Sequence, residues 1–284
     1  NGTNIIFIGD ADQLPPVKSG QPFKDFIESE RFEIARLTGN FRQNTFSETV
    51  KAARSIIQGQ SPQKSENFLA SDFVFFDVPQ AQQSDKILQL YFESMPNKLG
   101  VQPTEIQILS PQRAGHVGIN RLNNLIQNQT TRTSKPVLTR KSGNEDMQIF
   151  TGDKVIYRQN NYQLGVMNGD IGRVARESGN KLIVEFEGES GLKEVALVGK
   201  DKFDMEVAYA TTIHSSQGSE YPGVIVPVTS AHHYMLSRNL LYTAITRGKR
   251  QVCLVGEWNA FEKSISMFAK DFRYTLLSEV LLVR

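Results

Sequence analysis

Short runs of consecutive apolar residues limit the possible folds of this chain more than any other feature of the sequence. Such runs are typical of strands that are buried on both faces of a sheet. Segments with helical periodicity lie between them. This alternation predicts an α/β fold, in which a mostly parallel sheet carries helices on both faces. The runs occupy residues 73–76, 105–109, 223–228 and 251–255.

The pattern changes between residues 150 and 204, where short apolar stretches alternate with turn signals and no long helix fits. Asn168-Gly169 and Gly179-Asn180 are typical of hairpin turns. We expect a small SH3-like β-barrel here, inserted within the α/β domain, which on its own indicates only a binding or spacer module. Residues 130–146, which precede it, show little periodicity and predict a flexible connection. The expected strands are residues 154–157, 171–174, 181–186 and 194–197.

Local signals predict where three other elements begin and end. The stretch Thr45-Phe-Ser-Glu48 has the form of a helix capping box, with Thr45 as the N-cap. A helix over residues 84–95 is expected to end before Pro96, because the residue before a proline is biased away from helical geometry. The apolar run at residues 4–8 predicts one more buried strand.

Composition restricts how this chain can bind nucleic acid. The 284 residues carry a net charge of only +2, so any attraction to nucleic acid must be local. Residues 111–160 supply a local excess, with eight Lys or Arg against three Asp or Glu. The single cysteine, Cys253, lies in an apolar run and is expected to be buried. One cysteine, no signal peptide and no membrane-spanning run predict a cytoplasmic protein with no membrane partner.

Two polar stretches interrupt the apolar runs near the C-terminus. In residues 210–220, eight of the eleven side chains can donate or accept hydrogen bonds. Residues 241–249 predict a helical apolar face that ends in Arg247, a cation that nothing nearby in sequence neutralises. The ordinary explanation for residues 210–220 is a solvated loop. The ordinary explanation for Arg247 is that the helix dipole favours a cation at the C-terminal end of a helix.

Two more stretches of interest lie near the N-terminus. Residues 9–17 contain two prolines and therefore do not form a helix. Asp10 follows an expected parallel strand, and α/β proteins bind ligands at the C-terminal ends of such strands. Asp10 can therefore be mistaken for a magnesium ligand. Residues 37–43 contain Arg42, and a guanidinium is suited to stabilising the charge that phosphoryl transfer spreads over oxygen atoms.

These four stretches resemble, in order along the chain, motifs III, IV, V and VI of superfamily 1 helicases, most closely those of the RecD/TraA type. The resemblance covers nearly the whole chain and implies a RecA-like sheet of the P-loop NTPase kind. It implies catalytic roles for Gln13, Arg42 and Arg247 at the γ-phosphate of ATP. The nucleotide-binding residues that it implies are Gln217, Gly218 and Glu220.

The same resemblance implies contacts with single-stranded DNA. In RecD-like helicases the loop that matches residues 110–118 lies against the single strand. A helix follows this loop, and its N-terminus is expected to offer free backbone N–H groups to a phosphate. Tyr157, Arg158 and Tyr162 are further candidates from the expected barrel. The DNA-binding residues are expected to be Pro111, Arg113, His116, Asn168, Thr212, His214 and Ser215.

The sequence departs from the helicase pattern because it lacks a P-loop of the form Gly-x-x-x-x-Gly-Lys-Ser/Thr. We therefore expect ATP and Mg²⁺ to be held mainly by a missing N-terminal RecA-like lobe of the same protein, and we expect no metal site in this chain. In this division, residues 1–35 end the first lobe, residues 36–130 and 205–284 form the second lobe, and residues 150–204 form the barrel.

The sequence thus predicts the C-terminal motor part of an ATP-dependent DNA helicase that moves 5′ to 3′ on single-stranded DNA and is inactive alone. Nuclease-complex subunits are candidate partners, and DNA repair or recombination is the candidate process. One alternative is a non-enzymatic nucleic-acid-binding module that has kept a dead motor lobe, and another is a helicase of the Pif-type branch. An unrelated phosphate-binding α/β protein would need a glycine-rich phosphate loop, which the sequence does not contain.

Overall fold

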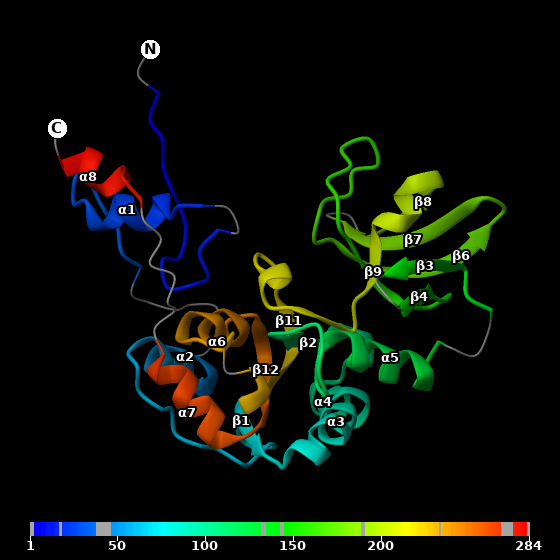
Figure 1. Ribbon diagram of the computed structural model, residues 1–284, viewed down its shortest axis with the longest axis horizontal. Coiled ribbons are helices and arrows are strands. Elements are labelled where there is room, and N and C mark those ends of the chain that lie inside the picture. Colours follow the sequence, from blue (N-terminus) through cyan, green and yellow to red (C-terminus); the bar gives the residue numbers. More distant parts are fainter. Residues whose placement is uncertain are drawn as a thin grey trace.

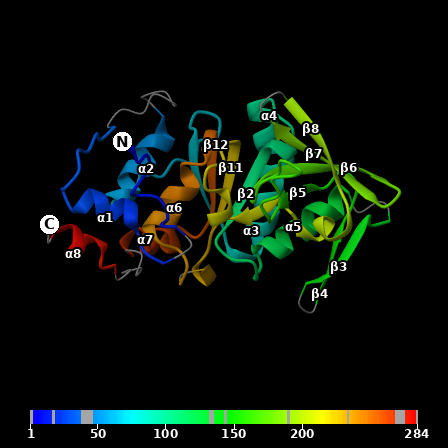
Figure 2. The ribbon, with the colours of Figure 1, turned by 90° about the horizontal axis from the view of Figure 1, so that it is seen from above.

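The chain folds into a parallel sheet covered by helices, with antiparallel strands beside it (Figure 1). Seen from above, the two parts follow one another along the long axis of the molecule (Figure 2). The computed structural model describes residues 3–16, 19–37, 47–131, 135–142, 145–188, 191–232, 234–267 and 275–282.

The parallel sheet has the strand order β1-β12-β11-β2-β10, and every pairing in it is parallel. The four apolar runs predicted as buried strands are all strands of this sheet. Cys253 lies in β12 and is fully buried, and burial raises the pKa of its thiol to about 12. The strands are β1 (Phe73–Asp77), β2 (Ile106–Ser110), β10 (Ala210–Thr212), β11 (Tyr221–Val228) and β12 (Gly248–Gly256).

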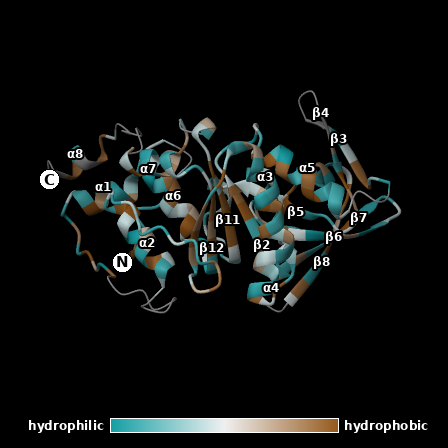
Figure 3. Ribbon diagram, turned by 90° about the horizontal axis from the view of Figure 1, so that it is seen from below, coloured by the Kyte–Doolittle hydropathy of each residue, from teal (hydrophilic) through white to brown (hydrophobic). Residues whose placement is uncertain are grey.

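Helices cover both faces of this sheet, which confirms the predicted α/β fold. One buried cluster joins the sheet to α2, α6 and α7 through side chains such as Ile56, Leu241 and Phe261. A second cluster joins the other face to α3 and α5 through Ile87 and Leu122. The strands between them are strongly apolar (Figure 3). The helices are α2 (Glu48–Ile57), α3 (Gln80–Gln89), α4 (Met95–Leu99), α5 (Ile119–Gln129), α6 (Arg238–Ile245) and α7 (Trp258–Ser266).

Two helix boundaries differ from the sequence prediction. Ser47, rather than Thr45, is the N-cap of α2, and its hydroxyl accepts a hydrogen bond from Val50 N; Thr45 lies outside the described residues. The helix predicted to end before Pro96 continues through it, because a π-helical segment, Leu90–Ser94, precedes α4. Pro96 is the second residue of α4 and cannot donate a backbone hydrogen bond, and the π-helical segment directly before it marks the break in the regular α-helical pattern.

The antiparallel strands lie in the chain between α5 and β10. Five of them form a sheet of order β8-β7-β6-β5-β9, and β3 pairs with β4 in a separate hairpin. This hairpin overlaps the region predicted to be a flexible connection, residues 130–146, so that prediction is wrong for residues 138–142 and 145–146. The SH3-like identity of the sheet and the domain boundaries stay predictions. The strands are β3 (Leu138–Ser142), β4 (Glu145–Ile149), β5 (Lys154–Tyr157), β6 (Ile171–Ser178), β7 (Lys181–Gly188), β8 (Gly191–Leu197) and β9 (Met205–Val207).

Turn chemistry explains one of the two predicted hairpins. Gly179 has a φ of +58° and, with Asn180, joins β6 to β7 as a two-residue turn. Gly169, with a φ of +104°, also turns the chain, but it ends a long loop between β5 and β6 rather than closing a two-residue hairpin.

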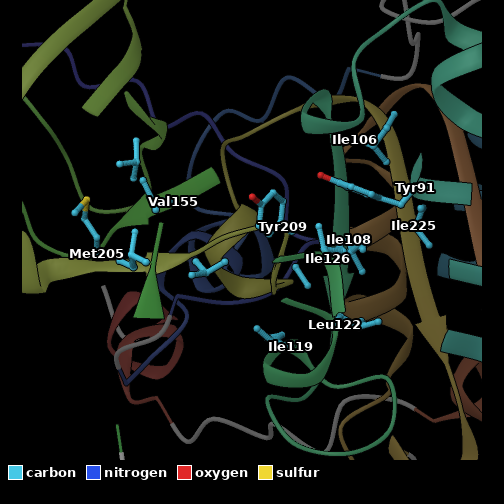
Figure 4. Packing of buried hydrophobic residues seen from close by; sticks show 14 of the residues in the cluster. Tyr91, Ile106, Ile108, Ile119, Leu122, Ile126, Val155, Met205, Tyr209 and Ile225 are labelled. Atoms are coloured by element: carbon cyan, nitrogen blue, oxygen red, sulfur yellow. The ribbon is translucent and has the colours of Figure 1, made fainter. Parts of the chain in front are cut away.

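A buried polar contact holds the antiparallel sheet against the parallel one. Asp153, before β5, is fully buried and accepts hydrogen bonds from Gln127 Nε2 at 2.6 Å, Phe150 N at 2.8 Å and the Tyr209 hydroxyl at 2.9 Å. These donors come from α5, from the segment after β4 and from the segment before β10. Tyr209 and Met205 continue the apolar core from the helices into the antiparallel strands (Figure 4).

The N-terminal segment does not form the buried strand that its apolar run predicts. Ile5, Ile6 and Ile8 are 72%, 83% and 92% exposed, and residues 4–8 pair with no strand of the described chain. A strand needs neighbours for its backbone groups and cover for its apolar side chains. The described part of the chain supplies neither at this place.

A small helical pair lies beside this segment, near both termini (Figure 1). It consists of α1 (Pro22–Glu28) and α8 (Leu277–Leu282), which are in contact. The Thr275 hydroxyl donates to Asp25 Oδ2 at 3.0 Å. Among the described residues, none of the helices has the length and apolar character that crossing a bilayer requires.

Candidate functional site

The N-terminal loop docks on α6 and on the polar stretch 210–220. Thr243 Oγ1 accepts a hydrogen bond from Leu14 N at 2.9 Å, and Gln217 Nε2 donates to Leu14 O at 3.0 Å. Asn239 Nδ2 donates to Asp12 O at 2.9 Å. Three of the four stretches singled out in the sequence therefore meet in space. The fourth candidate, Arg42, lies outside the described residues.

Gln13 and Asp10 form a polar contact at this junction. Gln13 Nε2 donates to Asp10 Oδ2 at 3.1 Å, and the Tyr242 hydroxyl donates to the same oxygen at 3.0 Å. Burial raises the pKa of Tyr242, and the charge of Asp10 raises it further, so the phenol remains a donor at neutral pH. The Gln13 amide is thus positioned by α6 through a shared carboxylate.

Arg247 lies just after α6 and is buried, with 6% of its surface exposed. Its guanidinium donates to Ser219 O at 3.1 Å, Thr243 O at 3.2 Å and Thr246 Oγ1 at 3.2 Å. Burial lowers the pKa of Arg247, while the charge of Glu220 opposes that effect. Three neutral oxygens orient this cation, so an incoming anion would not have to displace a carboxylate bonded to it.

Gly218 and Glu220 lie in the turn that passes Arg247. Gly218 has a φ of +86°, a backbone conformation that favours glycine. Glu220 Oε2 is 3.5 Å from Lys249 Nζ. The backbone between them carries the Ser219 carbonyl that accepts from Arg247. The candidate nucleotide-binding residues Gln217, Gly218 and Glu220 therefore surround one turn beside the buried arginine.

A second polar cluster lies where the two sheets meet. Thr212 Oγ1 and Ser215 Oγ are 2.6 Å apart, and Arg158 Nη1 donates to Ser215 Oγ at 2.9 Å. The same guanidinium donates to Glu206 Oε2 from Nε at 2.9 Å and from Nη2 at 2.7 Å. Arg113 Nη2 reaches this carboxylate oxygen at 3.0 Å. Arg158 thereby links the hydroxyls of the polar stretch 210–220 to the antiparallel sheet.

The loop between β2 and α5 differs from the expected phosphate cradle. The N–H groups of Ile119 and Asn120 donate to the carbonyls of Gln112 and Arg113, at 3.1 Å and 3.0 Å. The expectation of free N–H groups at this helix N-terminus is therefore wrong for these two residues. Glycine at position 118 allows this loop conformation, because a Cβ atom there would lie 2.2 Å from the Ala114 carbonyl oxygen.

Two candidate DNA-binding residues in the same loop, Pro111 and His116, do not lie in the cluster around Arg158. Pro111 is buried, so its side chain offers no surface to a ligand. The ring of His116 lies against α3, with Nε2 2.9 Å from Gln83 Oε1 and Nδ1 3.1 Å from Gln80 Nε2. Burial lowers the pKa of His116. Neither residue joins the cluster around Arg158.

The remaining candidates are mostly accessible. Asn168 and His214 are exposed, and Tyr162 is 77% exposed. Tyr157 is fully buried, which excludes a direct contact with DNA in this conformation. Within the described ranges, no three His, Cys, Asp or Glu side chains gather into a metal site.

Sequence patterns missed three residues that complete these clusters. Glu206 lies on β9, and Arg140, whose Nη2 lies 3.7 Å from Glu206 Oε1, lies on β3. No spacing or motif joins them to each other or to Arg158. Tyr242 reads as part of a helical apolar face, although its hydroxyl orients Asp10. The roles of Glu206, Arg140 and Tyr242 become visible only in the folded chain, where segments that are distant in sequence lie together.

Comparison with known proteins finds two matching family models. Residues 1–76 match an AAA domain, and residues 207–255 match a UvrD-like helicase C-terminal domain. The second match spans the polar stretch, α6 and Arg247, and the first contains the loop that docks on them.

Two curated relatives match over nearly the whole chain. An ATP-dependent RecD2 DNA helicase of Deinococcus radiodurans is 29% identical over 278 residues, which are 98% of this chain and 36% of the relative. The RecD subunit of the RecBCD enzyme of Mycobacterium tuberculosis is 28% identical over 272 residues, covering 90% of this chain and 45% of that protein. The chain thus spans less than half the length of each of these relatives.

A solved structure of Pif1 helicases at forked double-stranded DNA has the same fold. It superposes with a TM-score of 0.51 and 19% identity, covering 87% of this chain and 59% of that one. At this identity the likeness supports the RecA-like architecture alone, whereas the two curated relatives named above are RecD-type proteins.

Proposed function

Because this chain is a superfamily 1 helicase sequence of the RecD/TraA type, we propose that it forms the C-terminal motor part of an ATP-dependent DNA helicase. The observation that carries this proposal is the docking of the loop at residues 10–14 onto Gln217 and α6. A motor must link the state of its nucleotide to its grip on DNA. This loop connects Gln13, at the expected γ-phosphate side, with the stretch that leads to Thr212 and Ser215.

The residues of this chain fit one half of a nucleotide site. Arg247 and Arg42 would face the γ-phosphate from the second lobe, and Gln13 would sense it. When bound, ATP with its magnesium ion supplies the phosphoryl group that is transferred to water. An arginine supplied to such a site typically contributes about 10³- to 10⁵-fold in rate, because it stabilises charge on the transferred group. The desolvated setting of Arg247 strengthens this effect.

Single-stranded DNA would pass over the cluster at Thr212, Ser215, Arg113 and Arg158. Arginines bind phosphate with paired N–H groups, and hydroxyls add weaker contacts. We place His214, Asn168 and Tyr162 along the same track, because their side chains are exposed. The relationship to RecD-type helicases favours movement from 5′ to 3′.

The phosphate-binding lysine and the magnesium ligands would come from an N-terminal RecA-like lobe. The chain has no P-loop sequence, so the proposed function is that of a partner lobe rather than of a complete ATPase. Subunits of a nuclease complex are candidate partners in the cell, since one relative is a RecBCD subunit.

Replacement of Arg247 by Ala in the whole protein tests the nucleotide half of this proposal. We expect ATP turnover to fall by about 10³-fold or more, with DNA affinity nearly unchanged. Arg250→Ala is the matched control, because Arg250 is exposed three residues further along the chain. Equal turnover in the two variants would contradict the assigned role of Arg247.

The second candidate is a non-enzymatic nucleic-acid-binding module with a dead motor lobe, and the absence of a P-loop from the sequence encoded before Asn1 would favour it. In that case the chain binds single-stranded DNA, but the whole protein hydrolyses no ATP. A Pif-type helicase is less well supported, because the solved Pif1 structure shares the fold at only 19% identity.

A further inference from the structure

Glu206, on β9, lies at a point where arginines from three separate segments converge. Its Oε2 accepts from Arg158 Nε at 2.9 Å, from Arg158 Nη2 at 2.7 Å and from Arg113 Nη2 at 3.0 Å. Arg140 Nη2 lies 3.7 Å from the other carboxylate oxygen. One oxygen thus receives three N–H groups, which is the environment that an anionic phosphate oxygen seeks.

The cluster carries more positive than negative charge and is partly shielded from water. Three guanidiniums face one carboxylate, so two positive charges are left over. The side chains of Glu206, Arg158 and Arg140 are only 20%, 23% and 27% exposed. Arg158 also donates to Ser215, so the cluster is continuous with the hydroxyls of motif V.

The carboxylate remains charged in this setting. Burial on its own would raise the pKa of Glu206, but the guanidiniums of Arg158 and Arg113 outweigh it and hold the pKa below its usual value. At neutral pH a full negative charge therefore occupies the centre of the arginine cluster.

We propose that Glu206 is an internal substitute for a nucleic-acid phosphate. In the DNA-free chain it holds Arg113, Arg140 and Arg158 together, and a phosphodiester of single-stranded DNA takes its place when the strand binds. The inference rests on the proposed function and adds a regulatory element to it. Because each phosphate must compete with a tethered carboxylate, the grip on DNA is weakened and the strand can be released at every step.

The test measures binding of a fluorescent single-stranded oligonucleotide by anisotropy, without ATP. Glu206→Gln keeps the shape of the side chain and removes its charge, so we expect Kd to fall about tenfold. Glu194→Gln is the matched control. It makes the same change in net charge, and Glu194 pairs with Arg176 at 2.7 Å elsewhere in the antiparallel sheet. For this control we expect a change of less than about twofold.

Arg113→Gln supplies a second, independent variant, because its side chain is 53% exposed and its replacement should leave the fold intact. We expect its Kd to rise about fivefold. Unchanged binding by this variant would overturn the proposal even if Glu206→Gln failed to fold, which a thermal melt would reveal.

The outcomes separate this inference from the proposed function. Equal tightening by Glu206→Gln and Glu194→Gln would overturn the substitute-phosphate role and leave the helicase proposal standing. Weaker binding by Glu206→Gln would also overturn it, since the carboxylate would then only position the arginines. A chain that binds no single-stranded DNA, with or without Glu206, would overturn both.

Discussion

Lys154 provides a direct test of how the antiparallel sheet is held against the parallel one. It lies on β5 and is only 6% exposed. Its ammonium donates to Ile106 O at 3.2 Å and lies 5.7 Å from the centre of the Tyr221 ring. Burial lowers the pKa of Lys154 from 10.5 to about 7. We therefore predict that folding stability depends on pH through this single group.

The sign and size follow from proton binding. Above pH 7 the folded chain releases the Lys154 proton, while the unfolded chain keeps it up to its ordinary pKa. Since the unfolded state binds more protons in this range, stability rises with pH. Between roughly pH 7 and pH 9 the gain is about 2 kcal/mol. Replacement by Met, which has similar length and no charge, should remove this gain.

The assay is urea unfolding of wild type and Lys154→Met at several pH values, followed by far-UV circular dichroism. The quantity of interest is the difference in unfolding free energy between the two proteins, because other titrating groups cancel in it. Lys51→Met is the control, since the Lys51 side chain is 56% exposed. If the difference between wild type and Lys154→Met does not change with pH, the folded chain does not release the Lys154 proton near pH 7.

Three further predictions follow from the contacts described. Asp153→Ala leaves several buried donors without an acceptor. Urea unfolding should show that it lowers the unfolding free energy by about 3–5 kcal/mol. A loss below about 1 kcal/mol would contradict the role of Asp153 at the sheet junction. Thr243→Val removes the acceptor for Leu14 N and should speed amide hydrogen exchange at residues 10–14, whereas unchanged exchange would show that the loop does not depend on this bond. Ser47→Ala should cost about 1 kcal/mol through loss of the α2 cap, and an unchanged melting temperature would count against it.

The strands and helices of the parallel sheet could be predicted because burial on two faces leaves a strong local pattern. Continuous apolar runs such as residues 223–228 are typical of strands that are buried on both faces, and Gly179-Asn180 has the conformational freedom that its turn requires. The apolar run at residues 4–8 has the same pattern, but it lies exposed. A local apolar pattern indicates that a segment is suited to a buried strand. It does not indicate whether the described chain provides the neighbouring strands and the cover that such a strand requires.

The candidate site was predictable in parts, for a similar reason. Motif spacing pointed to Gln217, which donates to the N-terminal loop, and to Arg247, which lies just after the helix on which that loop docks. It could not show that Arg247 would be buried against carbonyl oxygens, or that the N–H groups of Ile119 and Asn120 would donate to carbonyls of their own loop. Glu206 carries no local signal at all, because its partners come from three other segments.

ATP hydrolysis is measured for this chain alone and for a longer protein in which the chain is joined to the proposed N-terminal lobe. Each is measured with and without single-stranded DNA. We predict no turnover by the chain alone and DNA-stimulated turnover, on the order of ten per second, by the longer protein. Turnover at that rate by this chain alone, or none in either protein, would contradict this prediction.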